Sequence, residues 1–306
     1  MIVCAGEALI DMLPRETASG EEAFAPYAGG AVYNTAIALG RLGAPAGYFG
    51  GLSSDLFGTL LADRLTEAGV SPTLAVRSEK PTTLAFVELE NGQASYTFYD
   101  ENSAGRMLAP EDLPDLDDGV EALFFGGISL VAEPCGSAFE ALMAAAAPTR
   151  AIMIDPNIRP SFVTDEDAYR ARLLRMLAMA DIVKVSDEDL QWLFGSGSHA
   201  DQGRALVAQG VSVVCVTEGA MGVTGYHATG SIRVGAEKVE VVDTVGAGDT
   251  FNAGLMAALH ASGVLTKEKL AEIDHPTLAA ALRYGARAAA VTVSRAGANP
   301  PTRDEL

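Results

Sequence analysis

The sequence predicts an α/β fold, with a central, mostly parallel sheet flanked by helices and a small additional β-sheet. Two observations indicate this class. Short continuous apolar runs alternate with amphipathic or Ala-rich stretches over most of the chain, which is typical of a parallel sheet covered on both faces. Residues 82–100 instead alternate apolar and polar side chains around Asn91-Gly92, which is the pattern of a β-hairpin.

The elements of the body follow from these runs in chain order. The whole chain, 1–306, is expected to form a single domain. Residues 9–29 read as extended and end at Gly29-Gly30, so we expect them to join 82–104 in a discontinuous β-sheet that acts as a lid. The expected strands are 2–6, 46–51, 122–127, 151–155, 181–186 and 211–217, and the expected helices are 31–42, 56–68, 136–147, 165–179, 187–194, 201–209, 247–262 and 276–293.

Composition excludes several classes of function. Hydrophobic residues make up 49% of the 306 residues and charged residues 20%, which suits a globular protein with a full core. The net charge of −19 argues against binding to nucleic acid, which requires clustered Lys and Arg. The apolar runs are too short to cross a membrane, and the N-terminal run, interrupted by Glu7 and Asp11, lacks the basic start of a signal peptide. We expect a cytoplasmic protein that binds neither nucleic acid nor membrane.

The three cysteines, Cys4, Cys135 and Cys215, lie in or beside apolar runs and form no Cys-x-x-Cys pair. We expect them to be reduced and buried, because their number and spacing suit neither a disulfide framework nor a zinc site.

The segment DTVGAGDTF (243–251) carries the strongest chemical signal. Gly246, Ala247 and Gly248 are small residues directly before an expected helix, where backbone N–H groups can converge on an anion. Asp249 then falls in the first helical turn, where a carboxylate can take a proton from a hydroxyl that attacks a phosphoryl group. A Gly-x-Gly-Asp sequence taken alone is equally consistent with an Asp that merely favours a helix N-terminus.

The surrounding residues resemble a known family. DTVGAGDTF resembles the second signature of the ribokinase-like (PfkB) carbohydrate kinases, and GGAVYNTAIALGRLG (29–43) resembles the first. The resemblance covers essentially the whole chain, because further matching pieces occur in the expected order. These pieces are GEALIDM (6–12), GGLSSDLFG (50–58), DPNIRP (155–160), VKVSDEDL (183–190), VTEGAMG (216–222) and SRAGANPP (294–301).

The resemblance implies a site for a sugar and ATP. It assigns Asp249 as the catalytic base and Arg159 as a contact to the phosphates. Taken alone, Asp11 is equally consistent with a carboxylate that faces solvent, and Asn34 with a residue that caps a helix. The implied anion hole is Gly246, Ala247 and Gly248; the implied sugar ligands are Asp11, Gly29, Gly30 and Asn34; the implied nucleotide contacts are Ser186, Thr217, Gly219, Gly222 and Gly248.

Two ions are also implied. Many relatives carry Asn-x-x-Glu before the nucleotide site, where it organises magnesium-bound water, and this chain has a Ser-x-x-Asp version from Ser186 to Asp189. Both substitutes keep the oxygen ligands that magnesium requires, so Asp189 is the expected indirect Mg²⁺ ligand. Asp243 lies where many relatives bind a monovalent cation, which makes it the expected K⁺ residue.

The sequence lacks the motifs of several other enzyme classes. The chain contains no Gly-Lys pair of a P-loop, no Gly-x-Gly-x-x-Gly after its first strand, and no His-Glu-x-x-His. The alternative from another class is a non-catalytic sugar- or nucleotide-binding regulator on the same fold.

The local amino-acid sequence favours fructose as the substrate sugar, with 2-keto-3-deoxygluconate and ribose as alternatives. The segments KPTTLAFVELENG and DPNIRPSF look most like those of fructokinases. Asp100 and Glu101 stand where kinases of the keto acid carry an Arg, so they should repel a substrate carboxylate, although Arg106 is near in sequence. Relatives often dimerise through the lid, and the alternating face of 82–100 permits a homodimer.

Overall fold

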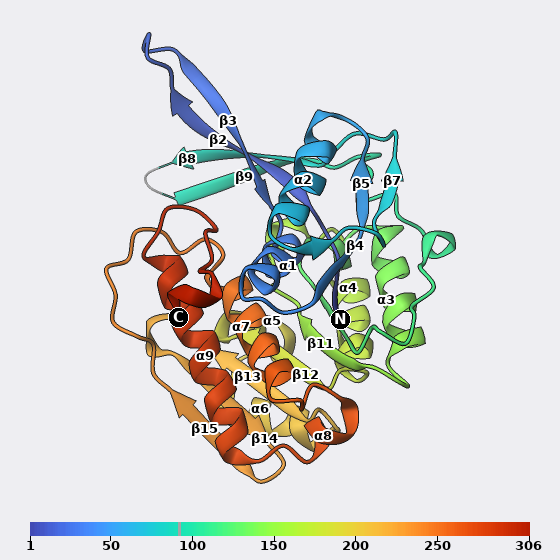
Figure 1. Ribbon diagram of the computed structural model, residues 1–306, viewed down its shortest axis with the longest axis vertical. Helices are drawn as coiled ribbons and strands as arrows, with labels where there is room; N and C mark the ends of the chain where they lie inside the picture. The colour runs from blue at the N-terminus through green and yellow to red at the C-terminus, as the bar shows by residue number, and fades with distance from the viewer. Residues whose placement is uncertain (91–92) are drawn as a thin grey trace.

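The computed structural model describes residues 1–90 and 93–306, in which nine strands form one sheet with helices on both faces (Figure 1). Its strand order is β15-β14-β13-β12-β11-β10-β1-β4-β6. The strands from β6 to β13 are parallel, whereas β14 and β15 pair antiparallel at the edge. The strands are β1 (Ile2–Ala5), β4 (Ala46–Phe49), β6 (Val70–Ser71), β10 (Ala122–Gly126), β11 (Ala151–Asp155), β12 (Ile182–Ser186), β13 (Val213–Thr217), β14 (Val223–His227) and β15 (Gly230–Val234).

The predicted α/β class is confirmed. Each of the six expected body strands corresponds to a strand of this sheet, because a strand buried on both faces reads as a continuous apolar run. The pair β14 and β15 was not predicted, since Thr224 and His227 interrupt β14 and three of the five residues of β15 are exposed, so neither strand reads as a continuous apolar run.

Helices form two layers with separate apolar cores. The layer of α1, α2, α7, α8 and α9 packs on one face of the sheet, and the layer of α3, α4, α5 and α6 packs on the other. The short α8 was not predicted; the other helices match the expected ranges to within about two residues. The bounds are α1 (Ala31–Arg41), α2 (Leu56–Glu67), α3 (Cys135–Ala146), α4 (Glu166–Leu177), α5 (Asp187–Phe194), α6 (His199–Ala208), α7 (Ala247–Ala261), α8 (Lys267–Ala271) and α9 (His275–Val293).

A smaller sheet has the order β3-β2-β8-β9 and lies across the top of the body in Figure 1. The strands β8 and β9 pair antiparallel as the sequence predicts, but the expected turn at Asn91-Gly92 lies outside the described residues. The parallel pairing of β2 with β8 joins the two halves. The bounds are β2 (Leu9–Glu16), β3 (Glu22–Gly29), β8 (Leu84–Glu90) and β9 (Gln93–Tyr99), while β5 (Gly51–Ser53) and β7 (Val76–Ser78) form a separate parallel pair.

The helix α7 is central to its layer. It packs between α1 and α9, and it approaches α9 so closely that a Cβ at Gly254 would lie 2.7 Å from the Cα of Gly285. The three cysteines are free and buried, as expected. Among the described residues, no helix combines the length and the apolar character that a membrane crossing requires.

Candidate functional site

A cavity of about 370 Å³ lies between the small sheet and the body. Its walls come from the small sheet, the connection between β1 and β2, the start of α1, the turn after β10, the loop after β11 and the loop that leads into α7. Of the residues assigned by resemblance, eight line it: Asp11, Gly30, Asn34, Arg159, Gly246, Ala247, Gly248 and Asp249. Segments from both ends of the chain therefore meet at one cavity.

The N-terminus of α7 forms one wall. Gly246 adopts a left-handed conformation with φ of 77°, and a Cβ there would lie 2.7 Å from the Cβ of Ala298, so this position requires glycine. The amide of Ala247 donates to the carbonyl of Thr244 at 3.3 Å. The amides of Gly248 and Asp249 have no backbone acceptor in the described part of the chain, so an anion at the helix terminus could satisfy them.

Asp249 is buried in the first turn of this helix, with 8% of its surface exposed. Burial is the main cause that raises the pKa of this carboxyl to about 7. The side-chain amide of Asn34 donates to Asp249 Oδ2 at 2.9 Å and opposes that increase. Asn34 belongs to the first turn of α1, so this contact joins the two predicted signatures.

The small sheet supplies Asp11, whose pKa is raised to about 6 by burial. Gly29 does not line the cavity but makes room for this side chain, because a Cβ at Gly29 would lie 2.2 Å from Asp11 Oδ2. Gly30 lines the cavity at φ of 106° and precedes α1 without offering a capping side chain.

Glu7 performs that capping, and sequence reasoning did not assign it to the site. Its Oε1 accepts from the amide of Val32 in α1, and its Oε2 accepts from the amide of Ser129, each at 3.3 Å. The carboxylate is buried in the cavity wall and burial raises its pKa. The sequence did contain a signal for Glu7, because a Glu in the first apolar run is costly to bury unless its carboxylate has hydrogen-bond partners or a function.

Two aromatic rings were also missed. Phe98 of β9 and Phe162, in the loop after β11, both line the cavity and meet edge to face with centroids 4.3 Å apart. This contact connects the small sheet to the body. Nothing in the sequence pairs these two rings, because they are far apart in the chain, although Phe98 lies in the predicted hairpin and Phe162 in DPNIRPSF.

The charge argument from Asp100 and Glu101 is wrong in its geometry, because neither residue lines the cavity. Asp100 Oδ1 instead accepts from Arg106 Nη1 at 3.0 Å, so these two charges neutralise each other away from the cavity.

The loop after β11 carries Arg159, which lines the cavity and donates to the carbonyl of Ile158 at 3.1 Å. Asp189 anchors this loop by a hydrogen bond to its backbone. Its Oδ1 accepts from the amide of Ile158 at 2.8 Å, and its Oδ2 accepts from the amide of Ser186 at 2.9 Å. Ser186 Oγ in turn accepts from the amide of Asp189, so the two residues form a capping box at α5. Asp189 is buried and does not line the cavity.

Apart from Gly248, the predicted nucleotide residues lie outside this cavity, at or just beyond the carboxyl ends of two neighbouring strands. Ser186 of β12 and Thr217 of β13 are paired in register. Gly219 and Gly222 follow in a tight turn with φ of 51° and 94°, and a Cβ at Gly222 would lie 2.1 Å from the carbonyl oxygen of Val234. The turn therefore depends on glycine at position 222.

Asp243 is also outside the cavity. Its Oδ1 accepts from the amide of Val245 at 3.0 Å, and its Oδ2 accepts from the amide of Gly297 at 2.9 Å. The carboxylate thereby ties the loop before α7 to the turn after α9.

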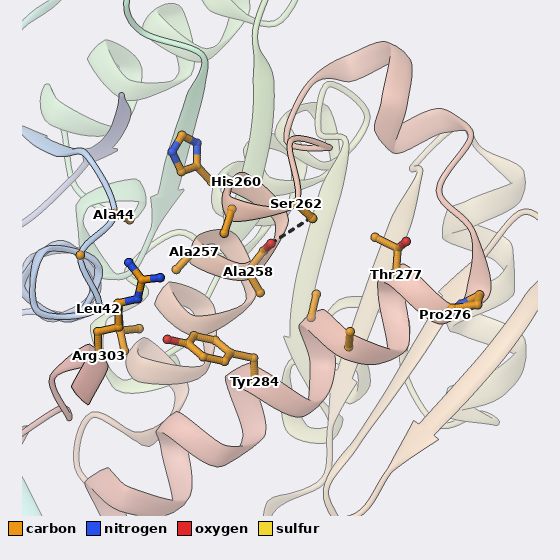
Figure 2. A pocket seen from close by; sticks show the side chains of 14 residues that line it. Leu42, Ala44, Ala257, Ala258, His260, Ser262, Pro276, Thr277, Tyr284 and Arg303 are labelled. Atoms are coloured by element: carbon orange, nitrogen blue, oxygen red, sulfur yellow. Dashed lines mark hydrogen bonds between the residues drawn. The ribbon is translucent and has the colours of Figure 1, made fainter. Parts of the chain in front are cut away.

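A larger cavity of about 670 Å³ lies at the other end of α7. Figure 2 shows Ala257, Ala258 and His260 of α7 on one side of it and Tyr284 of α9 on another, with Arg303 close by. It contains none of the predicted site residues and is lined mainly by small apolar side chains. The predicted site residues that line a cavity are therefore all at the smaller one.

Comparisons with known proteins identify similar chains of the same overall fold. A fructokinase of Rhizobium leguminosarum bv. trifolii is 51% identical over 278 residues, which is 91% of this chain and 85% of the relative. The crystal structure of a Xylella fastidiosa fructokinase with bound ATP has a TM-score of 0.85 at 31% identity, covering 97% of this chain and 93% of the other.

A double mutant of Vibrio cholerae O395 fructokinase, solved with fructose, ADP and potassium, has a TM-score of 0.84 at 27% identity, over 97% of this chain and 93% of the other. The pfkB family carbohydrate kinase pattern matches residues 1–305. Family match, fold and the convergence of both signatures on one cavity agree, and this chain belongs to the pfkB family of carbohydrate kinases.

Proposed function

We propose that this protein transfers the γ-phosphoryl group of ATP to a primary hydroxyl of fructose, with Asp249 as the general base. The observation that carries the proposal is the buried Asp249 carboxylate at the start of α7, because its pKa of about 7 suits proton removal near neutral pH. The 51% identity to a fructokinase supports the choice of sugar.

In the proposed reaction, Asp249 takes the proton of the sugar hydroxyl. The hydroxyl oxygen forms a bond to the γ-phosphorus as the bond to the β,γ-bridging oxygen breaks, and ADP leaves. The free amides of Gly248 and Asp249 stabilise the transferring group. Asp11, Gly30 and Asn34 bind the sugar, Gly29 makes room for Asp11, and Arg159 contacts phosphate. Ser186, Thr217, Gly219 and Gly222 contact the nucleotide.

The charge of the cavity supports a neutral sugar. Three carboxylates line it, those of Glu7, Asp11 and Asp249, against the single guanidinium of Arg159 among the described residues. A sugar acid would bring a fourth negative group into this wall, where the repulsion is only weakly screened. Fructose carries no charge, so it avoids this cost.

Magnesium and potassium are part of the proposal. The described residues contain no group of three or more His, Cys, Asp or Glu that could hold a metal. A magnesium ion held mainly by phosphate oxygens and water fits this donor set, with Asp189 acting only indirectly. Magnesium would neutralise charge on the phosphates. For potassium, Asp243 is the proposed ligand, since its carboxylate adjoins the loop before α7.

We further propose that the small sheet is the lid of a single-domain kinase and the interface of a homodimer. Its outer face carries a row of aromatic rings, in which Phe86 meets Phe24 at 5.0 Å and Tyr99 at 5.5 Å between centroids. Phe24 is 46% exposed and Tyr99 61%, and exposed apolar rings of this kind mark contact surfaces. The cytoplasm, where ATP is available and thiols stay reduced, is the proposed location.

The test is ADP release with a panel of fructose, 2-keto-3-deoxygluconate, ribose, glucose and adenosine at fixed magnesium and potassium. We expect the highest kcat/KM with fructose. A keto acid that exceeds fructose by more than about tenfold, or about 1.4 kcal/mol of transition-state discrimination, would contradict the charge argument from the cavity.

The rival function is a sugar- or nucleotide-binding regulator on the same fold. Such a protein would be stabilised thermally by sugar and ATP without sugar-dependent ADP release. Turnover that disappears in Asp249→Asn excludes it.

A further inference from the structure

Lys184 is a buried cation that the proposed reaction does not use. Its side chain lies on β12, is 6% exposed, and donates to Asp155 Oδ2 at 2.9 Å. The same oxygen of Asp155 accepts from Asn252 Nδ2 of α7 at 2.7 Å. Burying an ammonium and a carboxylate together costs solvation energy that their attraction often fails to recover, so this pair calls for a role other than stability.

The cation lies directly beneath the catalytic turn of α7. A Cβ at Gly248 would lie 3.3 Å from Lys184 Nζ, and Asn252 is one helical turn further along the same helix. The N-terminus of a helix carries partial positive charge, so an ammonium there is unfavourable unless anions lie close by. Asp155, Asp189 and Asp249 are such anions.

The cluster is also incompletely hydrogen-bonded. Among the described residues, Asp155 Oδ1 and Asn252 Oδ1 are buried without a hydrogen-bond partner. Buried polar atoms of this kind are rare in folded proteins, and a cluster built only for stability would satisfy them. None of the three residues lines the cavity, so they cannot touch the sugar there and must act through the helix above.

We propose that Lys184 and Asp155 are positioning residues with opposite effects on Asp249: the ammonium favours the ionised base, the carboxylate opposes it, and Asn252 holds the pair against α7. This inference rests on Asp249 being the base of the proposed function.

The charges around Asp249 agree with these opposite effects. Burial is the largest cause that raises the pKa of Asp249; Asp155 adds to the increase and Lys184 reduces it. Glu7 also raises this pKa, and Asn34 lowers it by its hydrogen bond. The charged groups that face the base or its cavity are Glu7, Asp11, Asp155, Arg159 and Lys184.

The experiment compares the pH profile of kcat/KM for fructose in the wild type, Lys184→Met, and the double variant Lys184→Met/Asp155→Asn. We expect Lys184→Met to move the acidic limb to higher pH by about one unit, the lower end of the shifts that a nearby opposite charge causes. The double variant should move the limb back toward the wild type. A purely structural pair would lower activity without this reversal, so an unshifted limb, or one that Asp155→Asn does not bring back, overturns the proposal.

Two further variants control for effects on folding. Lys184→Gln keeps a hydrogen-bond donor toward Asp155 without the charge, so it should show the same shift if Lys184→Met does not fold. Lys267→Met is the matched control, because Lys267 also pairs with a buried carboxylate, donating to Asp181 Oδ1 at 2.7 Å and Oδ2 at 2.9 Å, but lies outside the cavity wall. It should lower Tm and leave the limb in place.

The two proposals fail in different ways. Absence of sugar-dependent ADP release in the wild type, or full activity in Asp249→Asn, would reject the proposed function. A wild type whose acidic limb depends on Asp249, combined with an unshifted Lys184→Met, would reject only the role of Lys184.

Discussion

The side-chain amide of Asn34 donates a hydrogen bond of 2.9 Å to Asp249 Oδ2, across 215 residues of sequence. The bond joins the first turn of α1 to the first turn of α7. It favours the ionised carboxylate, whereas burial favours the neutral one and raises the pKa of Asp249 to about 7. The carboxylate is therefore held in one orientation with a proton affinity suited to a base at neutral pH, and its Oδ1 accepts no hydrogen bond from the described residues.

Replacing Asn34 by Ala should weaken sugar use and move the acidic limb of kcat/KM to higher pH, because the bond that lowers the pKa of Asp249 is lost. The KM for ATP should stay within a few-fold of the wild type. Asp11→Ala is the control, since Asp11 is not among the causes of that pKa, and it should reduce sugar kcat/KM without moving the limb. Equal losses for sugar and ATP would argue for misfolding or a misassigned site.

Asp249→Asn keeps the shape of the side chain and removes the base. We expect kcat to fall by roughly 10²–10⁴ while ATP still binds, as measured by turnover and by thermal shift with nucleotide. In the wild type, activity should decline below a pH of about 7 because the base becomes protonated. Near wild-type turnover in this variant would disprove the mechanism.

The same variant should be more stable than the wild type at neutral and alkaline pH. The folded-state pKa of Asp249 is raised from 3.8 to about 7, so ionisation destabilises the fold progressively between these values and to a constant extent above them. Removing the carboxyl should recover up to about 4 kcal/mol at pH 8 and almost nothing below pH about 4. Chemical denaturation at both pH values measures this; an equal effect at both would contradict it.

Two glycines of the anion hole should respond differently. Gly246→Ala forces a left-handed conformation on Ala and a contact with Ala298, so it should cost about 1–2 kcal/mol from the backbone alone and lower Tm. Gly248 lies within α7 without a positive φ, so Gly248→Val should fold by far-UV circular dichroism. Its side chain would crowd Lys184 and the phosphoryl position, and we expect kcat to fall roughly 10²–10³-fold. A folded Gly248→Val with wild-type kcat would show that this loop does not hold the phosphoryl group.

The lid interface can be tested by charge. Phe24→Glu and Tyr99→Glu each place a carboxylate in the aromatic row of the outer face, where burial against a second copy would be costly. We expect a dimer in the wild type and a monomer, or a concentration-dependent mixture, in each variant by sedimentation. Phe194→Glu is the matched control on an exposed ring of α5 and should not alter the mass. A wild type that sediments as a monomer contradicts the interface.

Much of the body could be predicted because its strands are buried on both faces and its helices are long. The edge pair β14 and β15 and the short α8 could not, since such segments lack a distinctive period. The joining of β2 to β8 was expected only as a shared sheet, because a parallel pairing between distant strands has no local signal.

At the site, the sequence assigned roles to residues of the two signatures, whereas Glu7 and Lys184 received none although they lie in the matching segments GEALIDM and VKVSDEDL. Asn34 and Asp249 carry family signatures, and the structure brings them into contact. Glu7, Phe98 and Lys184 matter through what lies beside them in space, which a linear sequence does not display. Lys184 in particular reads as one polar interruption of a strand, and only the position of α7 above it reveals its surroundings.

The packing of α7 between α1 and α9 has a consequence for synthesis of the protein. The ribosome synthesises α1 long before α7, so the apolar face of α1 that packs on α7 stays uncovered while most of the chain is made. A nascent chain that has completed β1 and the small sheet exposes this surface and should be a substrate for chaperones. Sugar and ATP cannot rescue such a chain, because the cavity that would bind them acquires its final wall only when α7 arrives.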